Sequence, residues 1–82
     1  MENQPITVYS RKSCVQCDAT YRLLDQYDLE YTVVNLDLDE KAFQDVAAMG
    51  YRQVPIVQCG KLHWSGFQPE KIRELAKQTV AY

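Results

Sequence analysis

Two cysteines separated by two residues, Cys14 and Cys17, follow a short apolar segment near the beginning of the sequence. That segment, Ile6-Thr7-Val8-Tyr9, is rich in β-branched residues and predicts a buried strand. The residues Ser13-Cys14-Val15-Gln16 then match the S-x-x-Q capping box, which predicts that a helix begins at Ser13. The cysteine pair is therefore expected where a strand gives way to a helix, and this position constrains both the fold and the chemistry.

The rest of the chain continues to alternate between segments of strand type and of helix type. Further strands are predicted at 31–35, 54–57 and 62–64, with a tight turn at Gly60 before the last of them. A second helix is expected after Asp37 or Asp39 and a third from Pro69. The apolar side of the second helix is expected to consist of Phe43, Val46, Ala47 and Met49.

The order of these elements predicts the topology. A helical crossover between the first two strands requires them to be parallel, whereas the short connection at Gly60 predicts an antiparallel pair. The order βαβαββα is that of an α/β domain with a thioredoxin fold, a four-stranded mixed sheet flanked by three helices. With 82 residues in total, we expect residues 1–82 to form this one domain.

A dithiol at the start of a helix is suited to disulfide exchange. Backbone N–H groups in the first helical turn lack partners and point toward Cys14, and Arg11 and Lys12 add positive charge nearby. Both effects favour the thiolate, which is the form of cysteine that attacks disulfides. Cys17 lies one turn further on and is expected to face the core. We therefore predict that Cys14 is the attacking nucleophile, that Cys17 resolves the mixed disulfide, and that the two form a redox-active disulfide.

Two other uses of the cysteine pair are open. Zinc accepts sets such as Cys14, Cys17, Cys59 and His63, and a disulfide can also serve as a structural cross-link. However, Cys59 ends an apolar strand, where cysteine usually acts as a small buried hydrophobic residue, and His63 is expected to be a partly exposed strand residue. A C-x-x-C motif beside a βαβ pattern favours redox chemistry, so we expect neither a metal nor a cofactor.

The overall composition excludes several classes of partner and location. The formal net charge is −2 and no run of basic residues exceeds Arg11-Lys12, which argues against nucleic-acid binding. No apolar run approaches the roughly 20 residues that span a membrane, and the N-terminal residues do not resemble a signal peptide. Three cysteines without a secretion signal fit a reducing compartment, so we expect the protein in the cytoplasm. We also expect it to be a monomer.

Two further segments are expected to lie beside the dithiol. In a thioredoxin fold the proline before the third strand is cis and faces the dithiol, and Pro55 occupies that place. A cis Val54–Pro55 bond would leave the Val54 backbone free to pair with an extended partner. The second segment is Trp64-Ser65-Gly66-Phe67. Aromatic residues are enriched at interfaces, so at least one of its two aromatic residues is expected at the surface rather than in the core. We therefore expect a docking surface made of Val54, Trp64, Ser65, Gly66 and Phe67.

With CVQC at 14–17, QVP at 53–55 and WSGFQPEKI at 64–72, the chain resembles the NrdH-redoxins from Ile6 to about Ala76. The resemblance implies reduction by NADPH through thioredoxin reductase. It also implies electron delivery to the large subunit of class Ib ribonucleotide reductase, in deoxyribonucleotide synthesis. Cys14 and Cys17 would be catalytic, Pro55 would be the cis-proline, and the WSGF segment would join a hydrogen-bond network beside the active site.

Two comparisons within this resemblance concern specificity. Gln68 stands where the family usually has arginine, which removes a charge and a forked donor. Glutaredoxins, the near relatives, carry a Gly-Gly turn and acidic residues that hold glutathione, and the segment 65–68 replaces them here. This favours a protein reductase as the electron donor, and a glutathione-dependent glutaredoxin is the alternative.

Overall fold

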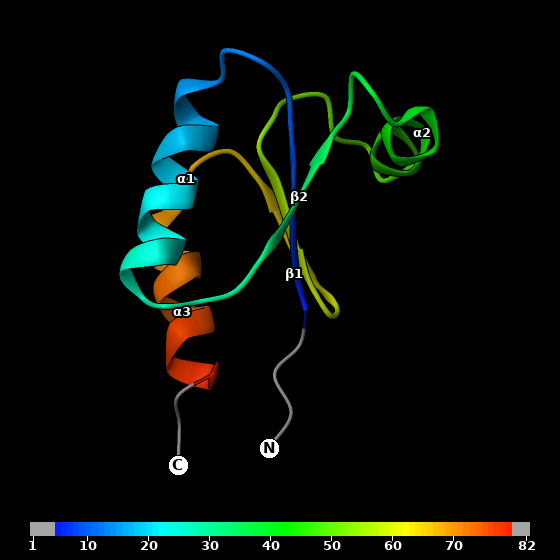
Figure 1. Cartoon of the computed structure of the whole chain (residues 1–82). Helices are drawn as coiled ribbons and strands as arrows, with labels where there is room; N and C mark the ends of the chain where they lie inside the picture. The colour runs from blue at the N-terminus through cyan, green and yellow to red at the C-terminus, as the bar shows by residue number, and fades with distance from the viewer. Residues whose placement is uncertain (1–4, 80–82) are drawn as a thin grey trace.

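The computed structural model describes the backbone of residues 5–79 and the side chains of residues 5–77. Its elements are β1 (Ile6–Ser10), α1 (Val15–Gln26), β2 (Thr32–Asn35), α2 (Glu40–Ala48), β3 (Ile56–Cys59), β4 (Leu62–Ser65) and α3 (Pro69–Thr79). The predicted order βαβαββα is confirmed (Figure 1). That residues 1–82 form one domain stays a prediction, because residues 1–4 and 80–82 lie outside the described residues.

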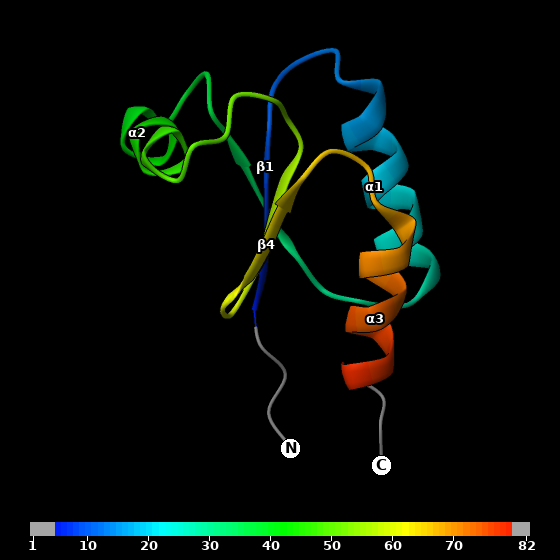
Figure 2. The ribbon, with the colours of Figure 1, turned by 180° about the vertical axis from the view of Figure 1, so that it is seen from behind.

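The four strands form one mixed sheet in the order β2-β1-β3-β4. β1 pairs in parallel with β2, as the helical crossover requires, and β3 is antiparallel to both β1 and β4. Figures 1 and 2 show α1 and α3 together on one side of the sheet and α2 on the other. The predicted thioredoxin fold is therefore confirmed.

The larger core lies between the sheet and the pair α1 and α3. In β1 every second residue is buried, so that Ile6 and Val8 face this core and the residues between them face the other side. Leu24 of α1 and Ile72 of α3 are fully buried against them. α3 begins at Pro69, as predicted, because proline fits the first helical turn without the loss of a hydrogen bond.

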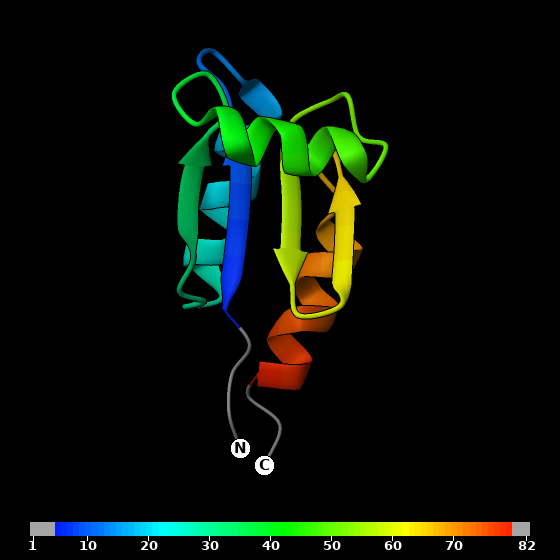
Figure 3. The same cartoon turned by 90° about the vertical axis from the view of Figure 1, so that its right-hand side faces the viewer.

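The smaller core lies under α2, which crosses only one end of the sheet (Figure 3). Ala42 and Val46, one turn apart, are its buried residues and pack with Leu36 and Ile56. Of the four residues predicted for the apolar side of this helix, only Val46 is buried, whereas Phe43, Ala47 and Met49 are exposed. A helix that covers only the end of a sheet needs no more than one narrow apolar stripe.

The N-cap of α2 was one of two predicted possibilities. Asp39 is the N-cap, and its carboxylate accepts a hydrogen bond of 3.0 Å from the Ala42 N–H. Asp37 lies two residues earlier and forms an ion pair with Arg11 instead. No helix formed by residues 5–79 combines the length and the apolar character that a membrane crossing requires.

Candidate redox site

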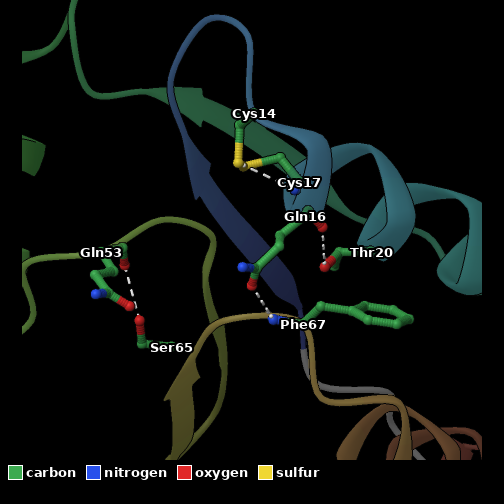
Figure 4. Close-up of a disulfide and its surroundings, with 7 residues drawn as sticks. All are labelled: Cys14, Gln16, Cys17, Thr20, Gln53, Ser65 and Phe67. Atoms are coloured by element: carbon green, nitrogen blue, oxygen red, sulfur yellow. Dashed lines mark hydrogen bonds between the residues drawn. A yellow bond between two sulfur atoms is a disulfide. The ribbon is translucent and has the colours of Figure 1, made fainter.

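The C-x-x-C pair lies at the start of α1, with Cys14 just before the helix and Cys17 in its first turn. Cys14 and Cys17 form a disulfide, with their Cα atoms 5.1 Å apart (Figure 4). Cys14 is half-buried, whereas Cys17 is only 2% exposed. An approaching molecule therefore reaches the Cys14 sulfur and not that of Cys17.

The helix begins one residue later than the capping box predicts. Cys14 rather than Ser13 is the N-cap of α1, and the Cys14 Sγ accepts a hydrogen bond of 3.1 Å from the Cys17 N–H. Ser13 has a φ of 56° and turns the chain sharply before the helix. The prediction for Ser13 is thus wrong, but the correction places the Cys14 sulfur directly at the positive end of the helix dipole. Hydrogen bonds from backbone N–H groups are stronger when the acceptor is charged, which favours a thiolate at this atom.

Arg11 and Lys12 follow β1 in the same loop. The Arg11 Nε lies 3.3 Å from the Asp37 Oδ1, and its guanidinium group lies 5.5 Å from the centre of the Phe43 ring. Arg11 thereby connects the loop to α2, although a half-exposed ion pair of this kind contributes only about 0–1 kcal/mol. Lys12 is exposed. That either residue stabilises the thiolate stays a prediction.

The predicted cis bond is present between Val54 and Pro55. Pro55 is fully buried, and its carbonyl oxygen accepts a hydrogen bond of 2.7 Å from the Gly66 N–H. Val54 is half-buried and packs against the small core under α2. Within residues 5–79 no hydrogen bond involves the Val54 backbone, so its donor and acceptor are available on the dithiol side of the fold.

The WSGF segment divides into a buried and an exposed part. Trp64 is 5% exposed and belongs to the large core with Leu24 and Ile72, so its prediction as a docking residue is wrong. Its position on β4 turns the indole toward α1 and α3. Phe67, in contrast, is 37% exposed, which confirms a surface position for one of the two aromatic residues. The Ser65 hydroxyl donates a hydrogen bond of 2.8 Å to the Gln53 carbonyl oxygen.

The contact that Gln16 makes in the site was not predicted from the sequence. The Gln16 side-chain Oε1 accepts a hydrogen bond of 3.0 Å from the Phe67 N–H, across 51 positions of the chain (Figure 4). The capping-box pattern predicts instead that Gln16 reaches back to its own helix end. Gln68 also remains hydrogen-bonded, since its amide donates to the Ser65 carbonyl oxygen at 2.9 Å.

The alternative zinc set is not brought together. Cys59 is buried and is paired in the sheet with Ile6 at the start of β1, whereas the dithiol follows the other end of that strand. Burial raises the pKa of the Cys59 thiol above its ordinary value. The His63 Nδ1 lies 2.6 Å from the Tyr51 hydroxyl. Across residues 5–79 no group of three or more His, Cys, Asp or Glu side chains could hold a metal ion.

The same arrangement occurs in known proteins. The family model for glutaredoxin matches residues 6–64. The glutaredoxin-like protein NrdH of Salmonella typhimurium is 46% identical over 70 residues, which cover 85% of this chain and 86% of that protein. The NrdH protein of Lactococcus lactis subsp. cremoris is 30% identical over 71 residues, which cover 87% of this chain and 99% of that protein.

Solved structures agree with these sequence matches. The NrdH-redoxin of Escherichia coli superposes with a TM-score of 0.84 at 41% identity, over 87% of this chain and 93% of that one. A glutaredoxin from Archaeoglobus fulgidus superposes with a TM-score of 0.77 at 26% identity, over 88% of this chain and 85% of that one. Because the identity to NrdH proteins extends over most of both chains and the disulfide lies at the expected helix end, this chain belongs to the NrdH-redoxins, thiol-disulfide oxidoreductases of the glutaredoxin family.

Proposed function

We propose that this NrdH-redoxin is reduced by NADPH through thioredoxin reductase and passes the electrons to the large subunit of a class Ib ribonucleotide reductase. It would act as a monomer in the cytoplasm and support deoxyribonucleotide synthesis. The observation that carries the proposal is the segment 65–68 beside the dithiol. It has neither a Gly-Gly turn nor acidic residues for glutathione, and its polar groups are hydrogen-bonded within the protein. The similar E. coli NrdH-redoxin has a thioredoxin-like activity profile, which also supports a protein as the electron donor.

The exposure of the two cysteine residues supports a two-step exchange. The Cys14 thiolate attacks one sulfur of the partner disulfide, forms a mixed disulfide and releases the first partner thiolate. The buried Cys17 thiolate then attacks the Cys14 sulfur, which releases the second partner thiolate and forms the Cys14–Cys17 bond. The partner gains two electrons and two protons. Thioredoxin reductase reverses the process with two electrons from NADPH.

The neighbouring residues would hold the partner in place. An extended segment of the partner pairs with the Val54 backbone beside Pro55, as an added strand. The exposed ring of Phe67, held by the turn at Ser65 and Gly66, supplies apolar contact area. Arg11 and Lys12 add positive charge to the loop that carries Cys14.

The test uses oxidised protein and NADPH in two parallel mixtures. One mixture contains thioredoxin reductase, and the other contains glutathione with glutathione reductase. We expect fast NADPH consumption only with thioredoxin reductase. Fast consumption only with glutathione would overturn the proposal and identify the alternative, a glutathione-dependent glutaredoxin. If the expected result is obtained, class Ib ribonucleotide reductase is then added as the electron acceptor. We expect its turnover to depend on the presence of this protein.

A further inference from the structure

Gln16 lies inside the C-x-x-C motif, yet its side chain points away from the sulfur atoms. Its Oε1 reaches the backbone of the segment 65–68 and accepts the hydrogen bond from the Phe67 N–H at 3.0 Å. The neighbouring residue Gly66 passes so close that a Cβ atom there would lie 3.5 Å from the same oxygen. The segment therefore lies directly against the Gln16 side chain.

Among the described residues, the other hydrogen bonds of the segment 65–68 do not involve α1. Ser65 and Gly66 are bonded to the carbonyl oxygens of Gln53 and Pro55, in the cis-proline loop. The Gln68 amide is bonded within the segment. Within residues 5–79, the bond between Gln16 and Phe67 is the one hydrogen bond that connects the segment to the dithiol helix.

The Gln16 backbone is itself held in place. Its carbonyl oxygen accepts a hydrogen bond of 2.9 Å from the hydroxyl of Thr20, which is fully buried one turn further along α1. The neighbours of Gln16 in sequence are the buried Cys17 and the highly exposed Val15. Because Gln16 is fixed within α1, its side chain holds the Phe67 backbone at a defined position relative to this helix.

We infer that Gln16 is a positioning residue that holds the segment 65–68, with the exposed Phe67, against α1 and thereby determines how well protein disulfides react. A protein substrate needs both the Cys14 sulfur and the surface around it, whereas a small uncharged disulfide needs only the sulfur. Loss of the Gln16 acceptor releases the segment 65–68 from α1. It therefore lowers the rate constant with a protein disulfide and leaves the rate constant with a small disulfide unchanged.

The experiment compares Gln16→Ala with Gln16→Glu, which keeps a side-chain oxygen at the same distance along the side chain. Gln26→Ala is the matched control, because Gln26 is an exposed glutamine at the other end of the same helix. Each prereduced protein is mixed with insulin or with hydroxyethyl disulfide, and the loss of its reactive thiols gives a second-order rate constant. These reactions need no thioredoxin reductase and no glutathione, so the result does not depend on the physiological reductant.

The ratio of the insulin constant to the hydroxyethyl disulfide constant is the decisive quantity. We expect Gln16→Ala to lower this ratio about three- to tenfold, the factor that corresponds to one hydrogen bond of ordinary net strength. Gln16→Glu should restore the ratio even if its charge slows both reactions, and Gln26→Ala should match the unmodified protein. An unchanged ratio in Gln16→Ala, or a ratio in Gln16→Glu as low as in Gln16→Ala, would overturn the inference.

Discussion

Gly66 and Gly50 offer a matched pair of substitutions, one at the redox site and one away from it. Gly66 has a φ of 87° and Gly50, after the end of α2, has a φ of 92°. Neither position is crowded, since a Cβ at Gly66 meets only the Gln16 Oε1 at 3.5 Å and a Cβ at Gly50 meets nothing within 4 Å. Replacement by alanine therefore tests the backbone conformation itself at both positions.

The expected loss of stability is nearly the same for Gly66→Ala and Gly50→Ala. The left-handed backbone conformation costs a residue with a Cβ about 1–2 kcal/mol of folding free energy. The smaller entropy of the unfolded alanine variant offsets about 0.4–1 kcal/mol of this. The net loss is about 1 kcal/mol, or about 4–8 °C in Tm for a domain of this size. A protein that begins with at least about 4 kcal/mol of stability stays about 99% folded after such a loss.

The two variants should differ in activity, because only Gly66 lies in the segment that Gln16 holds. A shift of residue 66 toward negative φ moves the Phe67 N–H away from Gln16 and weakens the bond from Gly66 to Pro55. We expect insulin reduction to fall severalfold in Gly66→Ala and to stay unchanged in Gly50→Ala, while urea unfolding shows similar losses in both. Equal activities, or a stability loss confined to one variant, would refute the reasoning.

Three further predictions concern the dithiol, the core and the third cysteine. Cys17→Ser should accumulate a mixed disulfide at Cys14 that mass spectrometry detects, whereas Cys14→Ser should form none; retained reductase activity in Cys14→Ser would contradict the assigned roles. Ile72→Ala, at a fully buried position of the large core, should lose about 2–5 kcal/mol in urea unfolding, and a loss below about 1 kcal/mol would contradict this placement. Burial raises the pKa of Cys59 above its ordinary value of 9.0, so the folded protein holds this proton more tightly than the unfolded chain. The stability that the protonated Cys59 contributes is complete below the ordinary thiol pKa. It is lost as the pH rises above that value toward the raised pKa of the folded protein. Unfolding free energies measured from about pH 8 to about pH 10 should therefore fall less steeply in Cys59→Ala than in the unmodified protein, and equal slopes would contradict the argument.

Much of the fold could be predicted from the sequence because it depends on local chemistry. The β-branched segment 6–9, the turn at Gly60 and the proline at Pro69 each predict one element with little need of the rest. The order of these elements then leaves few topologies, because parallel neighbours require a crossover. The dithiol could be predicted for the same reason, since C-x-x-C and the helix start lie within five residues.

Apart from the shift of the N-cap from Ser13 to Cys14, the errors concern positions that distant elements determine. Trp64 and Phe67 are both large aromatic residues of one short segment, and the first is buried because it packs with residues of α1 and α3, whereas the second is exposed. Phe43 fits the apolar periodicity of α2, but this helix covers only the end of the sheet. The bond from Gln16 to Phe67 joins positions 51 apart, so no local pattern indicates it.

The register of β1 against β3 keeps the buried Cys59 far from the redox pair Cys14 and Cys17. Cys59 lies opposite Ile6 at one end of β1, and Cys14 follows Ser10 at the other end. Four residue steps of a strand span about 13 Å, whereas cysteines whose Cα atoms are more than about 7 Å apart cannot form a disulfide without movement of the backbone. Each catalytic cycle therefore returns to the same disulfide as long as the sheet is intact. Mispaired oxidation requires the sheet to open, so the redox fidelity of this carrier is determined by its folding stability.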